Sequence, residues 1–243
     1  MDRATASFLQ ATTLWRRLPK SVLAEALAAT TRLELRRRQA LWAPASPATD
    51  LYVVRSGVVR IHRPADGHDG LTLSFHGRGD LCGEVGTLAA ALGATTQRHT
   101  RAVTHEDTTL FAMPAATLSR LMSEHASLGA ELAALVATRR RAVETRLSKL
   151  PFQSVPERLE AALCDLAVQF GIRDARGILV DLRLTHRDLA ALVGSTRETV
   201  SAVLARWRRA ERLVTEGRRL VLPIKTVRTV AGIATPHILR RAG

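Results

Sequence analysis

The stretch from Leu184 to Ser201 reads Leu-Thr-His-Arg-Asp-Leu-Ala-Ala-Leu-Val-Gly-Ser-Thr-Arg-Glu-Thr-Val-Ser. Apolar residues recur at helical spacing on both sides of Gly194, which is typical of a turn between two short helices. Thr185 is followed three residues later by an acid, and Ser195 stands in the same relation to Glu198. Because this spacing forms capping boxes, the stretch predicts a helix-turn-helix.

The second helix of this pair is predicted to extend to Arg209, with an apolar face made of Val200, Val203, Leu204 and Trp207. Arg197 and Glu198 fall off that face near the start, where a recognition helix meets base edges. Arginine can donate two hydrogen bonds to guanine, and glutamate can accept one from cytosine. Hydroxyl and imidazole groups nearby can bind phosphates and fix the register. The predicted DNA-binding residues are Thr185, His186, Thr196, Arg197, Glu198, Thr199, Ser201 and Arg206.

Other interpretations of this stretch stay open. Glu198 can serve only to close a capping box, and the arginines near the helix end can form a solvated face. Helix pairs with a turn glycine also occur in proteins that never touch DNA. Under that interpretation, the chain is a ligand-binding signalling module, and its helix pair contacts another protein instead of DNA.

The charge of the chain favours a polyanionic partner. The 243 residues carry a net charge of +14, most of it from arginine, and arginine that neutralises phosphates releases counterions. A GC-rich genome would produce a similar composition, so the placement of the charge decides. Between Arg183 and Arg219 there are nine arginines and four acids, which concentrates the charge on the predicted DNA-binding element.

Cysteine usage and hydropathy exclude several classes of protein. Two cysteines provide no disulfide framework and no ligand set for an iron–sulfur cluster held by this chain alone. No apolar run approaches a membrane span, and the first residues lack a signal sequence, so we expect a cytoplasmic protein with no membrane partner. No nucleophile elbow, P-loop or dinucleotide fingerprint is present, which argues against an enzyme.

The N-terminal half changes its period along the chain. Short helices are expected from Phe8 to about Leu35, followed by many short strands from Leu41 to Met113. Turns are expected at Ser56-Gly57, at Asp66-Gly67 and from Gly77 to Gly79. This pattern predicts a small β-barrel or roll.

A single long helix is expected from Leu118 to Leu150, about 50 Å at 1.5 Å per residue. An apolar seam of this length favours packing against a second copy, although a plain core helix is an alternative. Arg139-Arg140-Arg141 is interpreted as a solvated face. From Pro156 we expect a further helix that ends at Gly171, a strand over 178–180 and a β-wing around 216–219.

The stretch from Leu184 to Ser201 closely resembles the helix-turn-helix of the Crp/Fnr family of transcription regulators. Leu51 to His62 is similar to strands of that family's effector domain, Gly83 to Gly86 to its phosphate-binding segment, and Leu118 to Leu150 to its dimerisation helix. The resemblance implies an α+β protein: a β-roll over 1–113, a dimerisation helix over 114–150 and a winged helix-turn-helix over 151–225. The basic tail, 226–243, is left unassigned. It also implies a homodimer on double-stranded DNA, with RNA polymerase as a partner if the protein is an activator.

The resemblance further implies an effector site. Glu84 matches the residue that accepts from a ribose hydroxyl, and Arg98 matches the residue that pairs with a phosphate. The candidate effector-binding residues are Gly83, Glu84, Val85, Arg98, His99, Thr100, Val143 and Glu144.

Two departures from cyclic-AMP-binding members argue against cyclic AMP: Thr87 to Gln97 is about four residues longer, and Val143-Glu144 replaces the Thr-Ser pair that touches adenine. Ala202 replaces a further base-reading arginine, so the DNA site is expected to differ from that of the cyclic-AMP-responsive members. Another nucleotide, a different anionic ligand, or no effector at all stays open. His76, Cys82, His99 and His105 are candidate ligands for a haem or a metal ion, but their spacing forms no zinc pattern.

Overall fold

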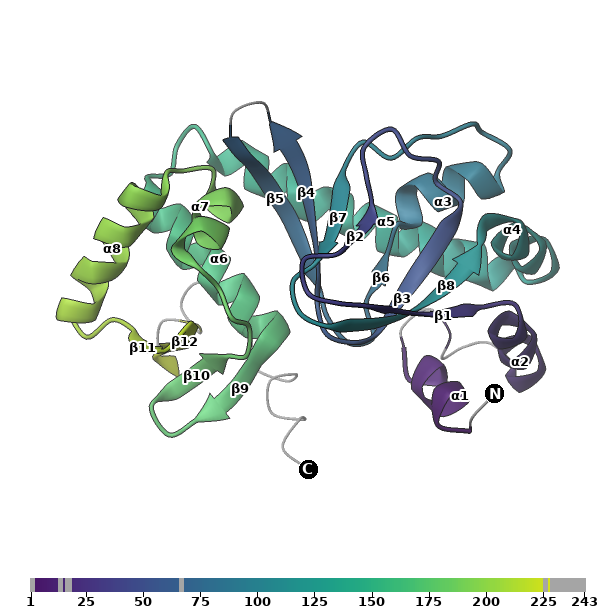
Figure 1. Cartoon of the computed structure of the whole chain (residues 1–243), viewed down its shortest axis with the longest axis horizontal. Helices are drawn as coiled ribbons and strands as arrows, with labels where there is room; N and C mark the ends of the chain where they lie inside the picture. Colours follow the sequence, from purple (N-terminus) through teal and green to yellow (C-terminus); the bar gives the residue numbers. More distant parts are fainter. Residues whose placement is uncertain (1–2, 13–14, 16–18, 66–67, 225–226, 228–243) are drawn as a thin grey trace. The chain divides into compact units, whose positions relative to one another are not determined.

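A computed structural model describes residues 3–12, 15, 19–65, 68–224 and 227. The described chain divides into two compact units (Figure 1). The first contains residues up to Pro64 together with Leu73–Thr145, and the second contains Ala65–Thr72 and the residues from Arg146 onward.

Two four-stranded sheets build the N-terminal roll, with strand orders β1-β8-β3-β6 and β2-β7-β4-β5. The elements of this part are α1 (Arg3–Gln10), α2 (Lys20–Ala28), β1 (Thr31–Leu35), β2 (Ala40–Trp42), β3 (Asp50–Ser56), β4 (Val59–Ala65), β5 (His68–His76), β6 (Leu81–Cys82), α3 (Glu84–Ala91), β7 (Arg101–Thr104), β8 (Thr108–Pro114), α4 (Ala115–Glu124) and α5 (Ala126–Lys149).

Strand β3 explains the continuous apolar run in this part of the sequence, because both of its faces are buried. Leu51 and Val53 belong to a core cluster shared with α1, α2, α4 and α5. Tyr52 and Val54 belong to a second cluster with residues of both sheets. Alternate side chains of one strand therefore enter two different cores.

The predicted roll and its turns are confirmed in most places. Gly57 has a φ of 80° between β3 and β4, and residues 77–79 form the turn between β5 and β6. The prediction of helix up to Leu35 is wrong, because Thr31–Leu35 pairs with β8 as strand β1. The expected turn at Asp66-Gly67 lies outside the described residues.

The prediction of one unbroken helix from Leu118 to Leu150 is also wrong. The backbone leaves the helical region at His125 (φ −132°, ψ 86°), which separates α4 from the 24-residue helix α5. On either side of the break, Leu118 and Leu121 of α4 share one core cluster with Leu128 and Leu132 of α5. Burial of both leucine pairs outweighs the helical hydrogen bonds lost at the break.

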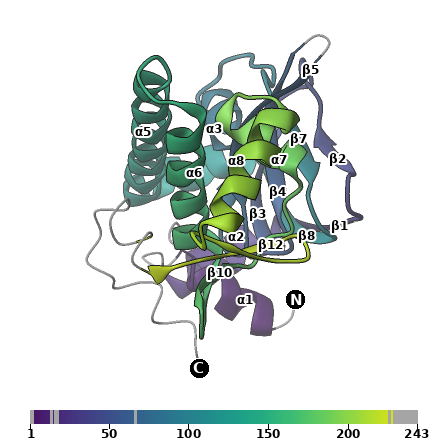
Figure 2. The ribbon, with the colours of Figure 1, turned by 90° about the vertical axis from the view of Figure 1, so that its left-hand side faces the viewer.

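The second unit is a winged helix-turn-helix made of α6 (Val155–Phe170), β9 (Gly171–Asp174), β10 (Gly177–Val180), α7 (His186–Val193), α8 (Arg197–Arg209), β11 (Val214–Glu216) and β12 (Arg219–Leu222). Its sheet has the order β11-β12-β10-β9, and β11 and β12 form the wing. The three helices pack against one another (Figure 2). The predicted order of roll, long helix and winged helix-turn-helix is thus confirmed, with the long helix beginning at Ala126. No helix of the described residues is both long and apolar enough to cross a membrane.

Candidate nucleic-acid interface and effector site

The recognition helix α8 begins one residue later than expected. Thr196 is its N-cap, and the Thr196 side chain accepts a hydrogen bond from the backbone N–H of Thr199. The predicted capping box between Ser195 and Glu198 is therefore wrong. Thr196 takes the cap because its hydroxyl, three residues before Thr199, satisfies a free N–H of the first turn.

Moving the cap removes the purely structural role for Glu198. Arg197 and Glu198 are the first two residues of α8, both are exposed, and neither forms an ion pair with another described residue. Their charged groups lie at the helix end where a recognition helix meets bases. Ala202, on the same exposed part of α8, carries only a methyl group.

The first helix of the motif matches its predicted cap. The Thr185 side chain accepts from the backbone N–H of Asp188, and the Asp188 carboxylate accepts from the Thr185 N–H and hydroxyl. His186 and Ser201 join α7 to α8, with 2.7 Å between His186 Nδ1 and Ser201 Oγ. Arg206 is exposed near the end of α8.

On the effector side, α3 begins at Glu84, whose side chain is 9% exposed. Its carboxylate forms a 2.6 Å ion pair with Arg139 of α5. Interpretation of Arg139 as part of a solvated face was wrong: its side chain is 27% exposed, whereas the neighbouring Arg140 side chain is 79% exposed. Arg139 precedes Val143 by four residues, so the two side chains share one face of α5. Because Val143 is a candidate effector residue, this spacing could have identified Arg139 as part of the same site.

Arg98 is buried, 6% exposed, and lies against the start of α3. Nη1 donates to the Gly83 carbonyl and Nη2 to the Asp50 carbonyl, each at 2.7 Å. The guanidinium also lies 4.5 Å from the centroid of the Trp42 ring. Burial lowers the pKa of Arg98, while Nε has no hydrogen-bond partner among the described residues. A buried cation that has an unsatisfied N–H and lies beside a helix N-terminus suits an anion.

Two glycines keep this corner open for the arginine. A Cβ on Gly83, which has a φ of 86°, would lie 2.8 Å from Arg98 Nη1. A Cβ on Gly86 would lie 2.6 Å from the Cβ of Ala48. Side chains at either position would displace Arg98 or the backbone that surrounds it.

The other predicted effector residues are less closely associated with this corner. Val85 and His99 are exposed, and Thr100 accepts a 3.3 Å hydrogen bond from Trp42 Nε1. Val143 is 39% exposed on α5, and Glu144 pairs with Arg140 at 2.7 Å. The Glu144 charge is therefore compensated by Arg140.

The candidates for metal or haem ligation do not gather into a site. No group of three or more metal-binding side chains occurs within the described ranges. His76 is buried, 2.8 Å from Ser74 Oγ, and burial together with Arg139 lowers its pKa to about 3. Burial raises the pKa of the Cys82 thiol, so the thiolate that a metal needs is disfavoured.

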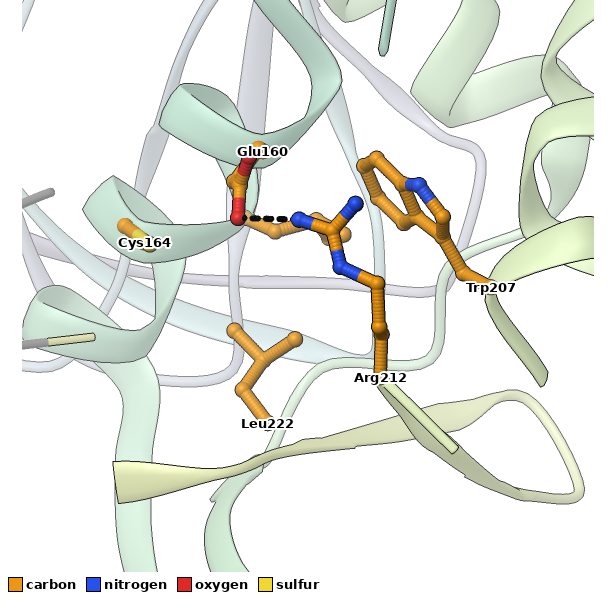
Figure 3. A pocket seen from close by; sticks show the side chains of 6 residues that line it. Glu160, Cys164, Trp207, Arg212 and Leu222 are labelled. Carbon is orange, nitrogen blue, oxygen red and sulfur yellow. Dashed lines mark hydrogen bonds and ion pairs between the residues drawn. The ribbon is translucent and has the colours of Figure 1, made fainter. Parts of the chain in front are cut away.

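A small pocket lies inside the second unit, lined by Glu160, Leu163, Cys164, Trp207, Arg212 and Leu222 (Figure 3). Arg212 pairs with Glu160 at 2.7 Å and lies 5.1 Å from the Trp207 ring centroid. Burial raises the pKa of Cys164 to about 11, so this thiol stays protonated at neutral pH. These contacts tie the end of α8 to α6 and orient the recognition helix.

Comparison with known proteins supports both the effector-domain roll and the winged helix-turn-helix. Residues 32–125 match the cyclic nucleotide-binding domain family, and residues 157–225 match the Crp-like helix-turn-helix domain family. A CRP-like cAMP-activated global transcriptional regulator of Mycobacterium tuberculosis is 30% identical over 205 residues, 81% of this chain and 88% of the relative. The chain belongs to the Crp/Fnr family.

Further relatives of this Crp/Fnr member differ in the effector that they are named for. The cyclic AMP receptor protein of Thermus thermophilus is 37% identical over 154 residues, 63% of this chain and 66% of the relative. The structure of the c-di-GMP responsive global regulator CLP of Xanthomonas campestris aligns with a TM-score of 0.72 at 25% identity, covering 84% of this chain and 99% of that one. The chain is a DNA-binding transcription regulator, as predicted, and its family is not an enzyme family.

Proposed function

We propose that this regulator works as a homodimer, that Arg197 and Glu198 read base pairs, and that the roll binds a nucleotide through a phosphate. The observation that carries the DNA-reading part is the free, exposed state of Arg197 and Glu198 at the start of α8. Neither is used by a cap or an ion pair among the described residues. Both are therefore available to base edges without breaking a contact in the protein.

The residue types assign the roles. Arg197 donates two hydrogen bonds to O6 and N7 of a guanine, and Glu198 accepts from N4 of a cytosine. Thr185, Thr196, Thr199 and Arg206 contact phosphates, which set the register without reading sequence. Ala202 offers no polar group, so it makes no hydrogen bond to a base. The protein therefore makes one base contact fewer in each half-site than a relative with arginine at this position.

Arg197→Ala tests the DNA-reading role, with Arg209→Ala as the matched control. Arg209 is exposed at the far end of the same helix. Selection of binding sites from a random duplex pool identifies the operator, and titrations then measure affinity. Arg197→Ala should weaken operator binding by about 1–3 kcal/mol and relax specificity at one base pair. Unchanged affinity and selectivity for Arg197→Ala would remove α8 as the reading element.

The effector part of the proposal rests on the Arg98 corner. A phosphate oxygen at the start of α3 would accept from the unpartnered Arg98 Nε and from backbone N–H groups of the helix. Glu84 would accept from a ribose hydroxyl while Arg139 holds its carboxylate in place. Val143 offers no hydrogen bond to a base, so the base or second phosphate is recognised differently from adenine in cyclic-AMP binders.

A panel of cyclic mononucleotides and cyclic dinucleotides tests this site by thermal melting and calorimetry. A nucleotide at 100 times its dissociation constant should stabilise the folded protein by about 2.7 kcal/mol. Arg98→Gln and Glu84→Gln should abolish or weaken that shift, whereas the exposed control Arg101→Gln should keep it. A full panel with no shift would favour a regulator that binds DNA without an effector.

Pairing of two copies is proposed along α5. Val136, Val143 and Leu147 are spaced by seven and four residues, which places them on one face of the helix, and the latter two are 39% and 50% exposed. Val143→Glu should convert dimer to monomer in analytical ultracentrifugation, while Thr138→Glu, on another face, should not. A dimer that survives Val143→Glu would place the interface elsewhere.

The cellular setting follows from the DNA partner. A regulator of bacterial genes acts in the cytoplasm, and an activator also contacts RNA polymerase. In vitro transcription from the selected operator decides between activation and repression.

A further inference from the structure

Ser201 lies one helical turn after Arg197 on α8, and two groups hold its hydroxyl. The Ser201 Oγ lies 2.7 Å from the carbonyl oxygen of Arg197. The same oxygen lies 2.7 Å from Nδ1 of His186, in the first turn of α7. Ser201 and His186 are both half-buried, so one side of the pair remains open to solvent.

These two short contacts determine where the hydroxyl proton lies. A carbonyl oxygen carries no proton, so an oxygen–oxygen separation of 2.7 Å requires that Ser201 donates to Arg197. A serine hydroxyl has one proton and two lone pairs. Because that proton is committed, His186 must donate from Nδ1–H to reach Ser201. One lone pair of Ser201 then remains.

The donation by His186 holds in either protonation state of the ring. Burial lowers the pKa of His186, and the nearby charges of Arg208 and Arg197 lower it further. A neutral ring in the Nδ1–H tautomer donates to Ser201, and so does an imidazolium. The polarity of the remaining Ser201 lone pair therefore does not depend on pH.

We propose that Ser201 reads DNA as a hydrogen-bond acceptor only, and that the N–H donated by His186 keeps the hydroxyl in this orientation. The base that it faces in the major groove must then present an amino group, which is N6 of adenine or N4 of cytosine. A serine with a free hydroxyl can also donate to guanine or thymine, so it discriminates little. Serine bonded only to the carbonyl four residues earlier is common in helices; the second contact, from α7, is what makes Ser201 selective.

This inference rests on the proposed DNA-reading role of α8, and the test separates the two. The full-length protein is titrated with its selected operator and with duplexes that carry all four base pairs at each half-site position. Ser201→Ala identifies the position that Ser201 faces. There, the wild type should favour adenine or cytosine over guanine or thymine by roughly 3- to 10-fold, as expected for one hydrogen bond.

Variants of His186 test the cause of the preference. His186→Phe removes the donor, so the preference at that position should fall toward 1-fold while other positions keep theirs. His186→Asn places an amide N–H near the position of Nδ1 and should restore the preference. Arg187→Asn, at the next residue of α7, is the matched control and should leave the preference intact. Circular dichroism checks that each variant is folded.

Each outcome decides something. A wild-type preference for guanine or thymine, or an unchanged preference in folded His186→Phe, would overturn the inference. If Arg197→Ala relaxes specificity while Ser201→Ala changes no position, this inference fails and the DNA-reading proposal stands. If neither variant changes specificity, α8 is not the reading helix and both fail. The same preference at pH 6 and pH 8 is expected, because both ring states donate.

Discussion

The first turns of α3 and α8 both carry a glutamate close to an arginine, yet the two helix ends use their charges in opposite ways. At α3, Glu84 is paired with Arg139, and Arg98 is buried against backbone carbonyls. At α8, Arg197 and Glu198 are exposed and form no ion pair with another described residue. Charge at α3 is thus held by contacts within the folded structure before any ligand binds, whereas charge at α8 is held by none. Substitutions at α3 should therefore cost stability as well as ligand binding, and substitutions at α8 should cost DNA binding alone.

Arg98→Ala is expected to have the largest effect on folding. It removes a charged donor from the Gly83 and Asp50 carbonyls, which then keep only their hydrogen bonds from Thr87, and it empties a buried volume over Trp42. The free energy of unfolding should therefore fall by about 3 kcal/mol or more. Urea unfolding measures the loss. Arg101→Ala, at an exposed site, should leave the midpoint unchanged. Equal effects of the two substitutions would contradict a structural role for Arg98.

Arg139→Ala and Arg140→Ala compare two adjacent arginines of α5. Removal of Arg139 leaves the nearly buried Glu84 without its ion pair and should lower the free energy of unfolding by about 1–3 kcal/mol. Arg140 pairs with Glu144 on the helix surface, so Arg140→Ala should leave stability unchanged within error. Thermal and urea unfolding check both variants. A reversed order would mean that the Glu84 pair contributes nothing to the fold.

The smallest effect on stability is expected near α8, where the positive charges of Arg208 and Arg197 act on His186. Burial, Arg208 and Arg197 lower the pKa of His186, so folding disfavours its charged form. The free energy of unfolding should therefore fall as pH drops through the ordinary histidine pKa of about 6.5. Arg208→Ala should raise the His186 pKa most and Arg197→Ala less, as followed by NMR titration of the imidazole. A larger rise with the control Arg209→Ala would contradict this account.

The sequence by itself determined the roll, the helix-turn-helix and the wing, because these depend on local signals. Short β-branched apolar runs, turn glycines and the Thr185–Asp188 capping box act over a few residues. The residues proposed to read DNA were identified from the same kind of signal, since their positions follow from where α8 begins. Even there, the cap moved from Ser195 to Thr196, because both residues can accept the hydrogen bond and the backbone geometry chooses between them.

Only the tertiary structure decided the contacts between residues far apart in the chain. Helix periodicity continues through His125, yet burial of Leu118, Leu121, Leu128 and Leu132 in one cluster breaks the helix there. The partner of Glu84 is 55 residues away, and the carbonyl acceptors of Arg98 carry no sequence signal, since every residue has one. The hydrogen-bond polarity of Ser201 likewise depends on His186 from another helix. Packing brings these groups together. For this reason the charged residues at the start of α3 are paired within the fold, whereas the similar residues at the start of α8 are exposed.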